Sequence, residues 1–105
     1  MVEWYTTETV AGKEIIQHLG VAMGSTIRAR NIGRDIIAGL RTLVGGELPE
    51  YTEMMAHARN QAIERMQQRA EEMGGDAIVS VRFSTAMVMQ GTAEVMAYGT
   101  AVKCR

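Results

Sequence analysis

The chain has 105 residues, with 11 Lys and Arg against 12 Asp and Glu, so its formal net charge at pH 7 is -1. This length makes one domain with a modest core, and the balanced charge gives no global attraction to nucleic acid or to an anionic membrane. A single cysteine, Cys104, excludes an intramolecular disulfide and is typical of a reducing compartment. No signal peptide and no apolar run of about 20 residues are visible. We therefore expect a single soluble cytoplasmic domain over residues 1–105.

The first third of the chain is expected to form two strands. A short strand covers Glu3–Thr7 and a longer one covers Glu14–Arg30. Alternation along the longer strand puts large apolar side chains on one face (Ile15, Leu19, Val21, Met23 and Ile27), and mostly smaller ones on the other (Ile16, His18, Gly20, Ala22, Gly24 and Thr26). Small residues in register allow a helix or a second chain to approach the sheet closely.

Two helical patterns follow. The first covers Asp35–Val44 and is ended by Gly45-Gly46, while Pro49 is suited to the first turn of the second, Glu50–Met73. In the second helix an apolar stripe is formed by Tyr51, Met54, Met55, Ala58, Ala62 and Met66, and it is widened by Ala56, Ile63 and Ala70. Because one sheet face does not need an apolar arc of roughly 160°, we expect the helix to have a second packing partner.

Two more strands complete the chain. Gly74-Gly75 ends the long helix, and the strand Ala77–Thr85 is expected to carry Val79, Val81 and Phe83 on one face. After a turn near Gln90–Thr92, a last strand covers Glu94–Cys104, with a face of mainly small residues from Val95 to Lys103. The order ββααββ predicts an α+β subunit of two layers, an antiparallel sheet packed by one short and one long helix.

A series of short stretches over nearly the whole chain carries a family pattern: Thr6-Thr7, Leu19-Gly20-Val21 with Gly24, Arg34-Asp35-Ile36, Leu40-Arg41, Gly45-Gly46-Glu47-Leu48, Tyr51, Ala58-Arg59, Ala62, Gly74, Asp76-Ala77-Ile78 and Gly99-Thr100-Ala101-Val102. Together they resemble the YbjQ-like family of small bacterial and archaeal proteins, labelled "putative heavy-metal-binding". Gly75 stands where the family pattern has alanine. The resemblance implies a dodecin-like subunit that assembles into a ring, a homopentamer, and it implies no reaction.

Metal-ligating residues are few. A soft or transition-metal ion needs thiolates, thioethers or imidazoles at bonding distance, and the chain offers no CxxC or HxxxH motif. His18 and Cys104 are the best candidate ligands, because ring symmetry would repeat each of them around an axis. Glu53 with His57 and Met87 with Met89 are weaker pairs, which we interpret as solvated helix surface and as apolar filling at an interface. A metal ion is the one cofactor that this reading suggests.

A second hypothesis is an anionic small molecule bound between subunits by Arg28, Arg34 and Arg41, near the start of the first helix. The alternative for these arginines is a set of solvated charges and intersubunit ion pairs. Nucleophile–base pairs and paired carboxylates in an apolar setting are missing from the sequence pattern, so an enzyme is not expected. A ring with only a structural or protein-interaction role is the remaining hypothesis, with other copies of the chain as the partner.

Overall fold

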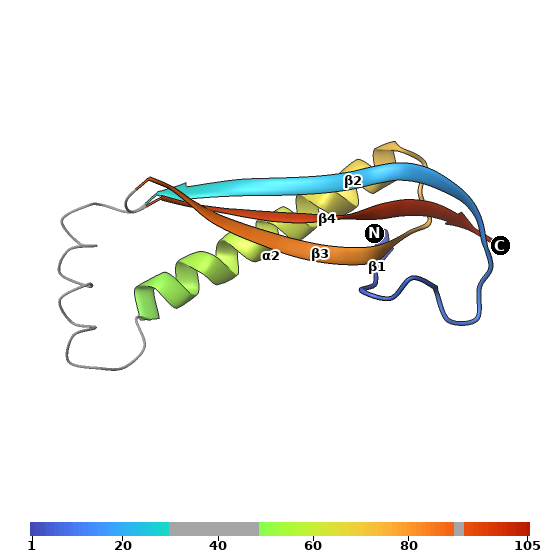
Figure 1. Ribbon diagram of the computed structural model, residues 1–105, viewed down its shortest axis with the longest axis horizontal. Coiled ribbons are helices and arrows are strands. Elements are labelled where there is room, and N and C mark those ends of the chain that lie inside the picture. The colour runs from blue at the N-terminus through green and yellow to red at the C-terminus, as the bar shows by residue number, and fades with distance from the viewer. Residues whose placement is uncertain (30–48, 90–91) are drawn as a thin grey trace.

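The computed structural model describes residues 1–29, 49–89 and 92–105, which form an α+β unit of two layers (Figure 1). Its elements are β1 (Glu3–Trp4), β2 (Ile15–Ala29), α2 (Pro49–Glu72), β3 (Ala77–Met89) and β4 (Thr92–Cys104). The four strands make one sheet in the order β1-β3-β4-β2, and α2 crosses one face of it. The α+β class and these elements are confirmed, whereas the expected short helix Asp35–Val44 lies outside the described residues.

The sheet is mixed, which corrects the expectation of an antiparallel one. β2 and β3 each pair antiparallel with β4, but β1 pairs parallel with the start of β3, Glu3 beside Ala77. A hairpin imposes antiparallel pairing only on strands joined by a short loop. β1 and β3 are far apart in the chain and joined by no such loop. β1 is also shorter than expected, although the backbone bonds Ser80 N to Thr7 O and Val81 N to Tyr5 O continue the contact with β3.

The signals predicted for the ends of the long helix are confirmed. α2 begins at Pro49, where a missing N–H leaves no bond unmade. At the other end Gly74 has φ of 82°, and the N–H groups of Gly74 and Gly75 donate to the carbonyls of Glu71 and Ala70. This pair of bonds is the Schellman arrangement that closes a helix. None of the described helices is long and apolar enough to cross a membrane.

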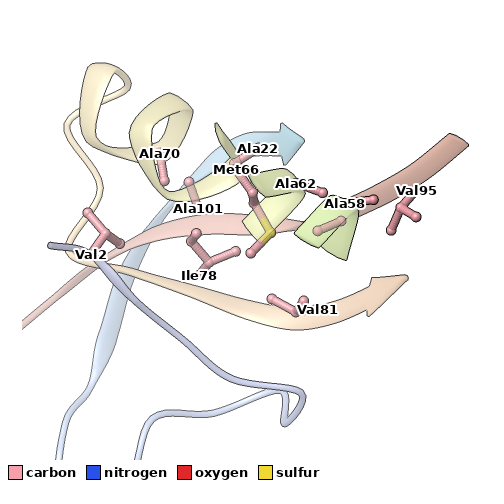
Figure 2. Packing of buried hydrophobic residues seen from close by; sticks show 11 residues of the cluster. Val2, Ala22, Ala58, Ala62, Met66, Ala70, Ile78, Val81, Val95 and Ala101 are labelled. Atoms are coloured by element: carbon pink, nitrogen blue, oxygen red, sulfur yellow. The ribbon is translucent and has the colours of Figure 1, made fainter. Parts of the chain in front are cut away.

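The core lies between α2 and the sheet face that we call the inner face. Figure 2 shows the buried side chains of this cluster gathered there: Val2, Ala22, Ala58, Ala62, Met66, Ala70, Ile78, Val81, Val95, Ala97 and Ala101. Most of them are alanines, and the small-residue faces predicted for β2 and β4 are both on this side. The predicted stripe of α2 is confirmed from Met54 to Met66 and continues to Ala70. Small side chains on both layers let the helix lie close to the strands.

Contact between the layers is tightest at Gly24 of β2. A Cβ placed on this glycine would lie 2.5 Å from the carbonyl oxygen of Ala62 and 2.6 Å from the Cβ of Arg65, and it would also strike the backbone nitrogen of Met66. Real Cβ atoms do not approach backbone atoms so closely. Two hydrogen bonds flank the contact, from Thr26 Oγ1 to Gln61 Oε1 at 2.7 Å and from Arg65 to the carbonyl of Ser25 at 2.6 Å. The helix backbone therefore rests directly on the strand backbone.

Side chains do not alternate regularly between the two faces of the sheet along β3. The prediction that Val79, Val81 and Phe83 share one face is therefore wrong. The pairing with β4 shifts between Val79 and Arg82, and Ser80 there has φ of 54°. Such a bulge adds one residue and reverses the face of everything after it. Val81 consequently packs in the core under α2, while Val79 packs with Val10, Ala77 and Val102 on the opposite, outer face.

The subunit is elongated. Its radius of gyration is 17.1 Å and its principal extents are 53 × 23 × 18 Å, whereas a compact domain of this length has a radius of gyration of about 13 Å. The long strands β2, β3 and β4 extend together away from the end that holds both termini (Figure 1).

We predict that Gly24→Ala lowers the free energy of unfolding by about 2–3 kcal/mol, because the added methyl group pushes two backbones apart. For a chain of this size such a loss lowers the melting temperature by on the order of 10 °C. Circular dichroism melts measure it. Ser25→Ala is the matched control on the same strand, where the side chain is exposed and the melting temperature should hardly change. Equal melting temperatures for the wild type and Gly24→Ala would contradict the close approach.

Candidate functional site

The outer face of the sheet carries large apolar side chains that remain exposed. The exposed fraction is 57% for Val21, 53% for Met23, 59% for Ile27 and 37% for Tyr98. Met23 lies directly opposite Tyr98 in the β2–β4 pair, and Val21 and Ile27 are on the same face of β2. Side chains directly opposite each other in such a pair are close neighbours. We call these four residues the outer patch.

One end of the outer face is covered by the chain itself. Val10, Ala77, Val79 and Val102 are buried together there, with Tyr5, Ile15 and Cys104 packed around them. The segment between β1 and β2 supplies Val10 and passes over this end, which lies near both termini (Figure 1). The outer patch lies further along the strands, beyond this cover. Burial of the outer face therefore stops partway along the sheet.

The structure brings the two candidate metal ligands to the same face on neighbouring strands. His18 of β2 is paired with Val102 of β4, and Cys104 is paired with Ile15. Val102 and Cys104 are two residues apart on one strand, so both pairs project to the outer face. A diagonal relation of this kind separates Cβ atoms by about 7–8 Å. His18 is exposed and Cys104 is half-buried, so an imidazole and a thiol lie on the same face of neighbouring strands.

Cys104, at the end of β4, packs beside the buried outer cluster and is also hydrogen-bonded to a carboxylate. Its backbone N–H donates to Oδ2 of Asp76 at 2.9 Å, which fastens the end of the strand to the start of β3. Nearby, the phenol of Tyr5 donates to Oε2 of Glu3 at 2.6 Å, and this hydrogen bond is the main reason that the pKa of Tyr5 is raised. The Cys104 position is thus held by strand pairing and a carboxylate, and it is not a frayed terminus.

A complete set of metal ligands does not assemble within one copy of the described chain. No group of three or more His, Cys, Asp and Glu side chains among the described residues is arranged to hold an ion. A structural zinc site takes four protein ligands and a catalytic one takes three. The His18–Cys104 pair therefore supplies only part of a site among the described residues.

The arginine hypothesis falls mostly outside the described residues. Arg34 and Arg41 are among the residues that the structure does not describe, and so is Arg30. Arg28 is placed in β2 opposite Ala93, near the end of the strand that is far from both chain termini. Nothing in the described part of the chain tests whether Arg28, Arg34 and Arg41 meet, and their role stays a prediction.

The weaker candidates are located as follows. His57 and Glu53 are both exposed on α2, consistent with their interpretation as helix surface. Met87 is 77% exposed on β3, so within one copy it does not fill an apolar interior. Met89 is in β3, but its side chain lies outside the description.

Sequence reasoning missed the outer patch. It separated the two faces of β2 correctly from Gly20 onward, but register shifts before Gly20 put His18 on the outer face and Leu19 against the inner cluster, the reverse of the prediction. The pattern showed one face of large and one of small residues, and it left open whether a helix or a second chain approaches the small face. In the structure α2 occupies the small face, so the large apolar side chains are turned away from the helix. The signal was the strand's apolarity on both faces, which is typical of a strand covered on both sides.

Comparison with known proteins gives close relatives over nearly the full chain. A UPF0145 protein of Methanosarcina acetivorans is 61% identical over 98 residues, which are 93% of this chain and 92% of that protein. A UPF0145 protein of Dehalococcoides mccartyi strain 195 is 62% identical over 96 residues, 91% of this chain and 92% of the relative. Another, from Halorubrum lacusprofundi, is 52% identical and spans 99% of this chain and all of the relative.

A solved structure shares the fold. It is a protein of the DUF74 family from Pediococcus pentosaceus, which superposes with a TM-score of 0.63 and 15% sequence identity over 99% of this chain and 98% of that one. At this identity the likeness concerns the fold alone. The family described as "putative heavy-metal-binding" matches residues 2–105. With that match and relatives above 50% identity, the chain belongs to the UPF0145, or YbjQ-like, family.

Proposed function

We propose that this protein is the subunit of a homo-oligomeric ring, and that the outer patch becomes covered when the ring forms. The observation that carries the proposal is the exposure of Val21, Met23, Ile27 and Tyr98 on one sheet face. Four such side chains leave on the order of 400 Å² of apolar surface, and patches of this size on single chains are often functional contacts. The family resemblance supports five copies of the 11.5 kDa chain.

The fold gives a second reason for assembly. A sheet with helices on one face needs something on the other face wherever that face is apolar, because apolar surface left in water costs roughly 25 cal/mol per Å². In the part of the chain that the structure describes, cover of the outer face is confined to the end near the termini. If the sheet of each copy curves with the helix layer outward, ring closure turns every outer patch toward the common axis.

Metal binding is the second candidate, and it rests on the shared face of His18 and Cys104. Imidazole and thiolate are the ligand types that zinc and copper ions take in proteins. The family description adds support, since it speaks of heavy-metal binding. One pair per copy is incomplete, so the proposal is a site repeated in every subunit and completed by solvent or by a neighbouring copy.

To test assembly, we predict that Met23→Glu converts the oligomer into a folded monomer. The Met23 side chain is 53% exposed, so a charged replacement stays solvated in one copy, whereas in the ring it would be buried beside identical charges. Light scattering measures the mass and circular dichroism checks the fold. Gln68→Glu, on the exposed surface of α2, is the control with the same charge change and should keep the oligomer. A wild-type protein that is monomeric at micromolar concentration would refute the proposal.

To test metal binding, we predict that the wild-type oligomer retains Zn²⁺ or Cu⁺ after desalting, with a stoichiometry proportional to the number of subunits. The double variant His18→Ala, Cys104→Ser should lose the metal and keep its mass, because His18 is exposed and Cys104 only half-buried. Native mass spectrometry reports both quantities together. His57→Ala is the control histidine and should retain the metal. Equal retention by the double variant would remove His18 and Cys104 as ligands.

A further inference from the structure

Two long strand edges of the sheet are free in the described part of the chain. β2 is the last strand of the order β1-β3-β4-β2, and no described segment pairs with its outer edge. On the opposite side β1 pairs only with Ala77 and Ile78, and Tyr5 and Thr7 bond to the next residues. Beyond Arg82 the outer edge of β3 has no described partner. Both free edges flank the same part of β4.

Neither edge has the usual protection against pairing with another chain. Natural proteins protect free edges with prolines, inward charges, lysines or bulges. The register shifts of β2 are at Ile15/Gln17 and His18/Gly20, before Val21, and those of β3 lie on either side of residues 82–87. Residues 21–27 and 83–87 contain no charged residue and no proline. Arg65 donates to the carbonyl of Ser25, and no other described residue is seen to pair with the outer edge of either regular part.

The inner face of β3 is also bare beside its free edge. α2 packs mainly on β2 and β4 and barely touches β3. Phe83 is 40% exposed, although its ring makes a T-shaped contact with that of Trp4, with 5.8 Å between the ring centroids, and Met87 is 77% exposed. On the same side of α2 as β1, Ala56 and Ile63 are only half-buried. No described segment therefore covers this part of the inner face of β3.

Resting on the proposed oligomer, we propose that the free edge of β2 in one copy pairs with the free edge of β3 in the next, so that the sheet continues from subunit to subunit. In a continued sheet the neighbour's α2 lies in the same layer as this copy's helix. It lies above the neighbour's β2, next to the bare Phe83 and Met87. One contact thus satisfies two strand edges and covers the apolar face of β3.

The direction of this pairing follows from the fold. β2 and β3 run parallel to each other, because each is antiparallel to β4. If all helices stay on one face and the strand order is repeated, the neighbour's strands must keep the same direction. The new pair is therefore parallel. The contact joins two different edges, so it is head-to-tail, and such contacts form a ring when the rotation between subunits closes.

Side-chain sizes favour this pairing over one between two β2 edges. On the outer face, Met23 and Ile27 of β2 would lie beside the small Ser84 and Ala86 of β3. On the inner face, Phe83 and Met87 would lie beside Ala22, Gly24 and Thr26. Pairing of two β2 edges would instead place large side chains beside large ones on the outer face and small side chains beside small ones on the inner face. Large against small is the better packed arrangement.

Hydrogen exchange of backbone amides tests the proposal on the full chain. Alternate amides of residues 21–27 and 83–87 point away from β4, and they should exchange at least 100-fold more slowly in the oligomer than in monomer produced by dilution or by Met23→Glu. Amides of β4 from Val95 to Ala101, which have neighbours on both sides, are the internal control and should be slow in both states.

Each outcome discriminates. Slow exchange of both edges in the oligomer alone supports the continued sheet. An oligomer whose outward amides stay fast refutes edge pairing but leaves the proposed ring intact. Edges that stay slow in the monomer refute it as well, because another part of the same chain then covers them. Protection of β2 alone would indicate pairing of two β2 edges and would also overturn the proposal.

Discussion

The contact of the α2 backbone with the β2 backbone at Gly24 is the constraint on which the rest of this structure depends. It exists because a glycine on the strand meets Ala62 and its neighbours on the helix, with no side chain between them. A helix can approach a sheet this closely only where both surfaces are small. The core is accordingly made mostly of alanines and has few large side chains, and Met66, Ile78, Val81, Val95 and Val102 are the largest that are fully buried.

Because α2 packs on the inner face of β2, the large apolar side chains of β2 are left on the outer face. The strand β2 is apolar on both sides, and once the helix takes the small side, Val21, Met23 and Ile27 are left facing outward. The N-terminal segment covers the neighbouring valines only at the end of the sheet near the termini. In the proposed oligomer, another copy of the chain covers the exposed side chains of the outer patch. His18 and Cys104 lie on the same sheet face, but at the end where the N-terminal segment packs, so oligomerisation and ligand binding would use different parts of one face.

The bulge at Ser80 links these surfaces to the edge of the sheet. It turns Val79 to the outer cluster and Val81 to the core, and it places Phe83 on the inner side, beside a helix layer that does not extend over it. Without this bulge, regular alternation would have put Phe83 on the outer face together with Val79. The inner-face position of Phe83 therefore follows from one residue with a positive φ, Ser80.

Local patterns in the sequence determined the α+β class, the positions of the strands, the start of α2 at Pro49 and its end at Gly74-Gly75. These features depend on neighbouring residues, whose periodicity and backbone preferences can be read directly. The relation of His18 to Cys104, the parallel pairing of β1, the bulge in β3 and the exposure of the outer patch were decided only by the tertiary structure. Each of these features depends on which distant segment packs against a given edge or face of the sheet. Packing between the layers decides this: α2 packs on the face of β2 with small residues, and the face with large residues stays exposed.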